Sequence, residues 1–308
     1  MSTLGRYWVP RYWPTWAFLL WLRLTAALPW HFAIALHKRL GRIAARLLPR
    51  RRRIVRRNLE LCFSDLDSEQ IEALTRQQFE NIGVFIAETA MAWFLSADRL
   101  AQLFRVEGIE HLNAAVARGR GVLLFSGHFT TLEICVPIIK PLTPLFAFMF
   151  RARHNALLNE FQTRCRRRAA HVALSNDNVR TVLRLLKQNA VVWYAPDQAR
   201  IDSGELLPFF GEPAMTSTAT SRLARLSGAA IVPFFFRRLP GDSGYLVRFH
   251  APLEDLPTDD AARDTVRLTG VLESFVRECP EQYFWTHRRF KGRPGDLADA
   301  YGAPPPAA

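Results

Sequence analysis

The residues best placed to do chemistry are His128 and Glu133. The apolar run at 121–126 (GVLLFS) leads directly into Gly127 and His128, and Glu133 follows five residues later. A strand that ends in a glycine and a helix start places reactive groups where strand end and helix N-terminus converge. If His128 lies in the turn and Glu133 in the first helical turns, the carboxylate can accept the imidazole Nδ1 proton. The pattern then predicts a general base whose Nε2 takes a proton from an attacking hydroxyl.

The H-x4-E pattern is short, so other interpretations stay open. On one continuous helix, residues five apart point about 140° away from each other, and the pair would not meet. A capping histidine and an unrelated surface carboxylate also fit. Zinc would need further ligands at a recognisable spacing, and the chain has no HExxH and no Cys and His cluster. The G-x-S-x-G pattern of a serine nucleophile is missing too.

The elements that must position this pair lie mostly beyond Val106. Five short apolar runs have the composition of buried strands: 121–126, 144–150, 190–195, 229–236 and 245–250. Helical patterns cover 156–169, 178–187, 216–226 and 261–278 between and after them. Strands that alternate with helices are typical of an α/β domain. We predict an α/β fold with a central, mostly parallel or mixed sheet flanked by helices, preceded by amphipathic helices over 68–103.

The N-terminal part predicts a hydrophobic membrane-anchor helix. From Trp13 to Leu36 the sequence is almost uncharged and rich in Leu, Ala, Trp and Phe, which is long enough to span a bilayer. Arg23 lies inside this segment, and Pro14 and Pro29 shorten the part that can form one helix. A helix that lies flat in the membrane interface is therefore an alternative, and a buried core helix is a third.

Basic residues gather directly after this segment. They occur with no acidic residue between them: Lys38, Arg39, Arg42, Arg46, Arg50, Arg51, Arg52, Arg53, Arg56 and Arg57. Together with the net charge of +13, they would attract anionic lipid, an acidic protein or nucleic acid, or form a solvated basic helix face. Their place after a tryptophan-rich apolar segment favours an anionic membrane, and the positive-inside rule would keep them cytoplasmic. No nucleic-acid binding motif is present.

Composition limits the remaining possibilities. With 308 residues and 49% hydrophobic content, the chain can bury the core of one large domain. Its four cysteines, at 62, 135, 165 and 279, are far apart and form no CxxC pair. They are typical of reduced thiols in a cytosolic environment.

Several longer motifs together resemble one family. They are GVLLFSGHFTTLE, VVWYAPDQ, LLPFFGEPAMTSTATSRLARLSGAAIVPFFFRR and CPEQYFWTHRRFKGRP. In this order, and with RYWPTW from Arg11 and NLELCF from Asn58, they are similar to the late acyltransferases of lipid A biosynthesis, the lauroyl and myristoyl transferases of Gram-negative bacteria. The resemblance covers nearly the whole chain.

The resemblance implies a reaction and its partners. The donor would be an acyl-acyl-carrier-protein thioester, and the acceptor a hydroxyl of a Kdo-bearing lipid A precursor at the cytoplasmic side of the inner membrane. An acyltransferase that acts on another lipid, such as an ornithine lipid or a lysophospholipid, is the alternative. We expect no metal and no organic cofactor, because a thioester is already activated and the hydroxyl needs only deprotonation, alignment and oxyanion stabilisation.

The family's site residues fall on four positions. His128 would be the general base and Glu133 its partner. Arg166 would hold an acceptor phosphate or the developing oxyanion, although a solvated basic helix face also fits it. Asp197, in APDQ, would orient a donor or brace an arginine, with a helix cap or turn as the alternative. The residues after APDQ, at 199–201, depart from the acidic, glycine-containing turn frequent in the family.

We predict four regions along the chain. Residues 1–37 form the N-terminal membrane anchor, and 38–105 a basic juxtamembrane and helical region. Residues 106–295 form the α/β acyltransferase catalytic domain, and 296–308 a flexible tail.

Overall fold

The computed structural model describes residues 3–150, 154–175, 178–198, 204–293 and 300–302. Its centre is a seven-stranded sheet in the order β1-β9-β8-β2-β5-β3-β4. The strands are β1 (Phe104–Glu107), β2 (Val122–Phe125), β3 (Phe146–Phe150), β4 (Val172–Ser175), β5 (Val191–Tyr194), β8 (Ala230–Arg238) and β9 (Tyr245–Phe249). Neighbouring strands are parallel except β8 and β9. The predicted mostly parallel sheet is confirmed.

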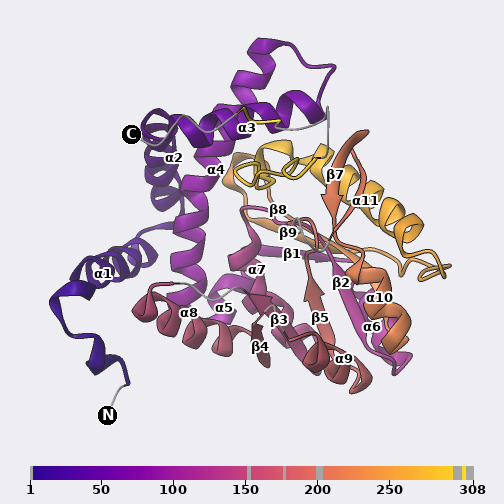
Figure 1. Cartoon of the computed structure of the whole chain (residues 1–308). Helices are drawn as coiled ribbons and strands as arrows, with labels where there is room; N and C mark the ends of the chain where they lie inside the picture. Colours follow the sequence, from indigo (N-terminus) through magenta and orange to yellow (C-terminus); the bar gives the residue numbers. More distant parts are fainter. Residues whose placement is uncertain (1–2, 151–153, 176–177, 199–203, 294–299, 303–308) are drawn as a thin grey trace.

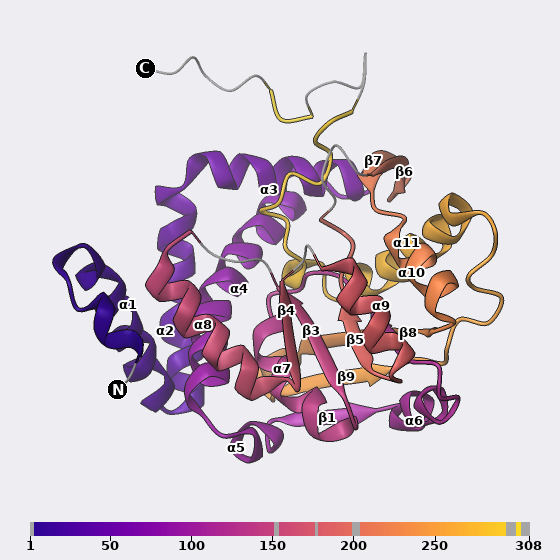
Figure 2. The same ribbon diagram turned by 60° about the horizontal axis from the view of Figure 1, so that its bottom comes forward.

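Helices lie around and beside this sheet (Figures 1 and 2). They are α1 (Trp13–Ala27), α2 (Trp30–Leu47), α3 (Pro49–Cys62), α4 (Ser68–Phe94), α5 (Ala97–Ala101), α6 (Ile109–Ala117), α7 (Leu132–Ile139), α8 (Ala156–Ala169), α9 (Val179–Lys187), α10 (Ala219–Ser227) and α11 (Ala261–Glu278). Every residue of β2 is buried, as expected for a central parallel strand with both faces covered. In Figure 1, α1, α2 and α4 lie on the left, α3 lies at the top, and α10 and α11 lie on the right.

All five predicted strands and all four predicted helices of the α/β part are present. The strands that the sequence pattern missed lie at the margins. β1 and β4 are the two edges of the sheet, and β1 is only half-buried and carries Arg105. The hairpin of β6 (Glu205–Phe209) and β7 (Glu212–Thr216) contains prolines and exposed positions. Short strands at a sheet edge or with a proline inside give a weak signal.

Helix α4 is the longest element and connects the helical side to the sheet. Asp67 caps its start with a reciprocal capping box with Gln70. Glycines let α2 touch it: a Cβ at Gly41 would lie 2.1 Å from the Phe79 carbonyl oxygen, and one at Gly83 2.0 Å from that of His37. This close packing fixes the position of α4, which carries side chains into the site described below.

The N-terminal segment bends where one long helix was a possibility. α1 ends at Ala27 and α2 begins at Trp30, with Leu28 and Pro29 extended between them. At 1.5 Å per residue, the 15 residues of α1 reach about 22 Å, short of a hydrocarbon core of about 30 Å. Within the described residues no helix combines the length and apolarity needed to cross a membrane. The stretch Trp13–Leu36 is therefore divided between two helices and does not form one continuous helix.

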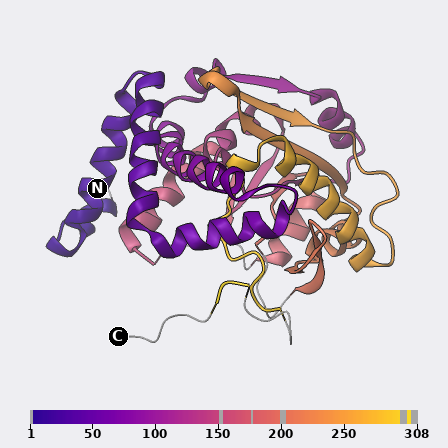
Figure 3. The ribbon, with the colours of Figure 1, turned by 90° about the horizontal axis from the view of Figure 1, so that it is seen from above.

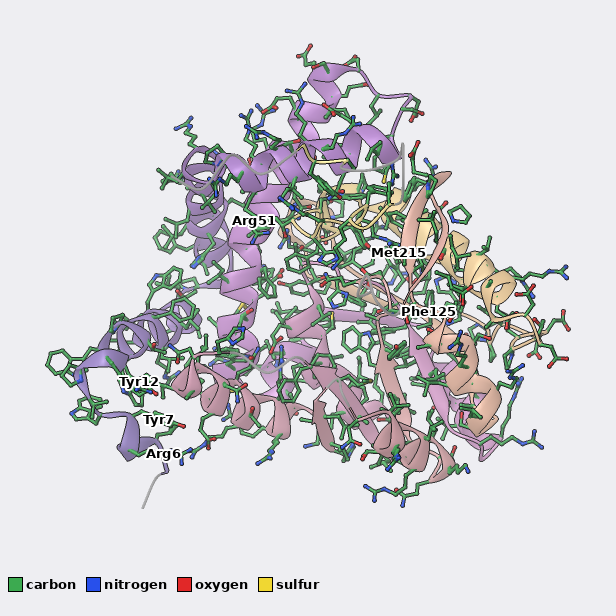
Figure 4. The ribbon with its side chains drawn as sticks, viewed as in Figure 1. Arg6, Tyr7, Tyr12, Arg51, Phe125 and Met215 are labelled. Carbon is green, nitrogen blue, oxygen red and sulfur yellow. The ribbon has the colours of Figure 1, made fainter. Side chains whose placement is uncertain are left out.

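Helix α1 is attached to the rest of the molecule along one face. Leu19, Leu22 and Ala26 are buried in a cluster with Trp93 of α4 and Leu157 of α8. Ahead of it, Tyr7 and Tyr12 pack edge to face with ring centroids 5.0 Å apart, at the lower left of Figure 4. Figure 3 shows α1 and α2 at the side of the molecule away from the sheet.

The predicted flexible tail at 296–308 falls mostly outside the described residues. Among its described residues, Tyr301 is held in place: its hydroxyl donates to Asn58 Oδ1 at 2.6 Å and accepts from the Phe290 amide at 2.9 Å. This short stretch is therefore part of the folded structure.

Candidate active site

Two polar residues emerge at the same level from adjacent strands. β2 and β5 are parallel neighbours, with Phe125 opposite Tyr194. His128 follows Phe125 by three residues, and Asp197 follows Tyr194 by three. Because the carboxyl ends of parallel strands open at one edge of the sheet, both side chains reach the same place. Phe125 is labelled near the centre of the molecule in Figure 4.

His128 and Asp197 are joined by two hydrogen bonds. The imidazole Nδ1 lies 2.6 Å from Asp197 Oδ1, and the His128 backbone N–H donates to Oδ2 at 3.0 Å. The Asp197 side chain is completely buried, whereas that of His128 is 32% exposed. The contact at Nδ1 fixes the ring, and Nε2 remains as the nitrogen that can accept a proton.

Burial and charge act in opposite directions on this pair. Burial lowers the pKa of His128, but the charge of Asp197 and its hydrogen bond outweigh that effect and raise the pKa above 6.5. For Asp197, burial raises the pKa, and the charge and hydrogen bonds of His128, with a hydrogen bond from Tyr283, lower it well below 3.8. The carboxylate is therefore ionised at neutral pH, and the imidazole is a stronger base than free histidine.

The space beside Asp197 is small. A cavity of about 10 Å³ lies there, lined by Phe125, Asp197 and polar side chains that include Thr220 and Arg289. Such a volume holds about one water molecule and no substrate. The side of His128 that is open to a ligand is its exposed side.

A tyrosine from the end of the chain completes the cluster. The Tyr283 hydroxyl donates to Asp197 Oδ2 at 2.8 Å, and the side chain is buried. Burial, and then the charge of Asp197, raise the pKa of Tyr283 well above 10, so it keeps its proton and donates. Gly127 makes room for it, since a Cβ there would lie 2.5 Å from Leu272 and 3.2 Å from the Tyr283 ring.

Glu133 belongs to a second, closed cluster. Its carboxylate accepts from Arg166 Nε at 3.1 Å and Nη2 at 2.8 Å, and from Trp93 Nε1 at 2.9 Å. The guanidinium carbon lies 5.3 Å and 4.9 Å from the ring centroids of Phe148 and Phe150. Both charged side chains are nearly inaccessible, at 4% and 10% exposure. This is a buried ion pair that ties α7 to α4 and α8.

The model of the bacterial lipid A biosynthesis acyltransferase family matches residues 3–292. The chain is 38% identical to the lipid A biosynthesis lauroyltransferase of Escherichia coli over 95% of its own length and 96% of the relative's. It is 37% identical to the palmitoleoyltransferase of that organism, over 95% of each chain. It is 32% identical to a lipid A biosynthesis acyltransferase of Haemophilus influenzae, over 93% of each chain.

The chain belongs to this family. It is an acyltransferase of lipid A biosynthesis, as the sequence motifs predicted.

In this lipid A acyltransferase, the four predicted site residues form two pairs. The structure joins His128 to Asp197 and Glu133 to Arg166. The prediction that Glu133 accepts the Nδ1 proton differs from the structure, where Asp197 holds that position. The physical reason lies in α7: Glu133 is in its first turn and extends toward α4 and α8, where Trp93 and Arg166 satisfy both of its oxygens.

Sequence reasoning missed Tyr283 and Trp93. Both lie far along the chain from the residues they contact, 86 positions from Asp197 and 40 from Glu133. A short motif cannot reveal such pairs, although QYFW around Tyr283 was part of the family resemblance.

No group of three or more His, Cys, Asp or Glu side chains that could hold a metal ion occurs among the described residues. The departure from the family's turn at 199–201 lies outside the described part of the chain.

Proposed function

We propose that this enzyme transfers a fatty acyl chain from acyl-acyl-carrier-protein to a hydroxyl of a Kdo-bearing lipid A precursor, with His128 as general base and Asp197 as its orienting partner. The observation that carries the proposal is the 2.6 Å contact between His128 Nδ1 and the buried carboxylate, with the ring partly exposed. Positioned proton transfer of this kind contributes typically about 10² to 10⁴ in rate.

The proposed step needs no covalent enzyme intermediate. Nε2 of His128 takes the hydroxyl proton while the oxygen attacks the thioester carbonyl, and Asp197 stabilises the imidazolium that forms. The tetrahedral oxyanion then collapses, the carbon–sulfur bond breaks, and the leaving thiolate receives the proton from the imidazolium. The ester and a free carrier thiol result, so atoms and charge balance.

The cysteines support direct transfer rather than an acyl-enzyme. All four are buried. Burial raises the pKa of Cys62, Cys135 and Cys279 well above 9 and that of Cys165 to about 11, so their thiols stay protonated and unreactive.

For Glu133 we propose a positioning role through Arg166. A guanidinium that is already neutralised by a buried carboxylate offers little net charge to a substrate phosphate. The ion pair instead fixes the positions of α7 and α8 relative to each other, next to the turn that carries His128. The phosphate or oxyanion role expected for Arg166 stays a prediction.

We also propose that the enzyme lies on the cytoplasmic face of the inner membrane through its N-terminal arm, residues 3–48. Among the described residues, the large hydrophobic side chains that are exposed concentrate there, eleven in the arm against four elsewhere. The arm's are Trp8, Val9, Trp13, Phe18, Leu20, Leu24, Phe32, Leu40, Ile43, Leu47 and Leu48. An apolar face beside basic residues is typical of an interfacial helix.

Some of the basic residues between Lys38 and Arg57 support this membrane location, and others form contacts within the folded protein. Arg42 and Arg52 are paired with Glu80 and Glu72 of α4, and Arg56 with Glu60. Arg51, labelled on α3 in Figure 4, is exposed and donates to the Thr286 carbonyl oxygen at 3.4 Å. The exposed arginines at the start of α3 keep positive charge beside the apolar arm, where it would attract anionic lipid at about 1 kcal/mol per residue.

The function is tested by reconstitution. Purified enzyme is incubated with a Kdo-bearing lipid A precursor and acyl-acyl-carrier-protein. The mass of the lipid product is then measured by mass spectrometry. We expect a mass increase of one acyl chain, formed about 10² to 10⁴ times more slowly by His128→Ala. If product forms only from an ornithine lipid or a lysophospholipid, the proposed acceptor is wrong. If the enzyme prefers acyl-coenzyme A, the proposed donor is wrong.

The membrane arm is tested by flotation with vesicles that contain anionic phospholipid. Leu20→Ser with Leu24→Ser removes two side chains that are 60% and 59% exposed. Leu226→Ser is the matched control, because this residue is 64% exposed on α10, outside the arm. We expect a lower bound fraction for the arm variant alone. Equal binding of both variants would contradict the proposed surface.

A further inference from the structure

The segment after α11 crosses the turn that carries His128, residues 127–131. We define residues 280–285 as the C-terminal strap; it begins with the short 3-10 helix η6 (Pro280–Gln282). The Thr130 amide donates to the Gln282 carbonyl oxygen at 2.7 Å, and the Phe284 amide donates to that of His128 at 2.9 Å. Phe129 and Tyr283 face each other between these bonds as an isolated β-bridge. The backbone on both sides of the bridge, His128 included, is therefore held by the strap.

The strap is itself fixed to the sheet and to the helical layer. Gln282 pairs with the backbone of Arg238 in β8, accepting from its amide at 2.8 Å and donating to its carbonyl oxygen at 3.0 Å. Asn58 of α3 donates to the carbonyl oxygens of Trp285 and His287 at 2.6 and 2.8 Å. Fixed at both ends, the strap has little freedom to move Tyr283 relative to the strand ends.

Tyr283 holds the oxygen of Asp197 that the imidazole ring does not use. Oδ1 faces the ring nitrogen, whereas Oδ2 accepts from both the His128 amide and the Tyr283 hydroxyl. Two donors on one oxygen fix the carboxylate plane and therefore the direction in which Oδ1 meets Nδ1. The Tyr283 ring is packed independently of its hydroxyl, with ring centroids 5.5 Å from Phe129 and 4.8 Å from Trp285.

We infer that Tyr283 is a positioning residue of the transfer reaction. The strap holds the Tyr283 hydroxyl against Asp197, where it orients the carboxylate and competes with His128 for the carboxylate's negative charge. The inference rests on the proposed His128 and Asp197 base. A donor that competes for the carboxylate's charge weakens the attraction between that carboxylate and an imidazolium. Tyr283 therefore improves the geometry of the base and moderates its basicity.

Two further groups near the pair bear on its pH profile, His287 and Arg289. Burial and the charge of Lys291 lower the pKa of His287 to about 4, so it is neutral where His128 titrates. The charge of Arg289 lowers the pKa of Tyr283, but burial and the charge of Asp197 outweigh it. The acid side of the pH profile of kcat/KM therefore reports on His128.

The test is Tyr283→Phe, which removes one oxygen and keeps the packed ring. We expect kcat to fall about 10-fold, the usual scale for a hydrogen bond to a charged group. The acid limb of the pH profile moves to higher pH, because Asp197 then interacts more strongly with protonated His128. Tyr245→Phe is the matched control, since it removes another buried hydroxyl that donates to a carboxylate, Glu88 Oε1 at 2.9 Å. Its pH limb should stay in place.

The Asp197→Asn variant distinguishes a failure of the inference about Tyr283 from a failure of the proposed His128 and Asp197 base. If Asp197→Asn is impaired but Tyr283→Phe keeps the wild-type rate and limb, the inference is wrong and the proposed base stands. A loss of rate in Tyr283→Phe with an unmoved limb, or one moved to lower pH, also overturns the inference. If Asp197→Asn itself has the wild-type rate and profile, the proposed base fails. In the Asp197→Asn background, the Tyr283→Phe change should have no further effect on the limb.

Discussion

Asp197 and Glu133, two buried carboxylates near the turn that carries His128, differ in their surroundings. Asp197 holds a histidine that is 32% exposed, so the cluster opens toward solvent on one side. Glu133 holds an arginine that is only 10% exposed and lies against aromatic rings, so that cluster is closed. The carboxylate nearer in sequence to His128 is the one that does not hold its ring. Parallel strand pairing decides the partner, and distance along the chain does not.

Replacement of His128 should have the largest effect. His128→Ala removes the atom that accepts the proton, and transfer should fall by about 10² to 10⁴. Steady-state turnover of purified protein measures it. Circular dichroism and vesicle flotation serve as controls and should be unchanged. Wild-type turnover would mean that the open cluster is not the catalytic one.

Replacement of Asp197 should change the pH dependence of turnover. An imidazole must be neutral to accept a proton, so a pKa above 6.5 makes wild-type activity fall as pH drops through a value above 6.5. Asp197→Asn removes the charge that raises this pKa, so the acid limb should move to lower pH. Turnover at the plateau should fall by about 10²-fold, because the imidazolium loses its partner. A limb that does not move would assign the pKa to another group.

Replacement of Glu133 in the closed cluster should mainly lower the free energy of unfolding. Glu133→Gln leaves a buried guanidinium without its counter-charge, which costs about 3 to 5 kcal/mol of unfolding free energy. Glu254→Gln, which breaks the exposed pair with Arg118, is the control and should cost at most about 1 kcal/mol. Chemical denaturation measures both. The remaining activity of Glu133→Gln should keep the wild-type pH limb, whereas a shifted limb would return Glu133 to the role first predicted for it.

The smallest effect is expected from metal removal. A thioester donor requires no Lewis acid, so enzyme treated with a chelator should keep its rate with purified donor in detergent micelles. A loss of activity that zinc alone restores would reassign His128 as a metal ligand.

How much the sequence could predict follows from the range of the interactions. The buried strands and helices around 121–126 and 261–278 carry their signal locally, in runs of apolar residues, and were predicted. His128 was predicted because a strand, a glycine and a histidine are consecutive. Its pairing with Asp197 depends on β5 lying next to β2, and the contact with Tyr283 depends on the path of the strap. Such long-range contacts follow from the assembled fold, and no short motif contains them.

Asp197, and not Glu133, should control the basicity of His128. Nuclear magnetic resonance titration of the His128 ring measures this directly, in the wild type, Asp197→Asn and Glu133→Gln. We predict a pKa above 6.5 in the wild type, a clear decrease in Asp197→Asn and a value close to wild type in Glu133→Gln. A pKa that falls in Glu133→Gln and stays in place in Asp197→Asn would contradict the account.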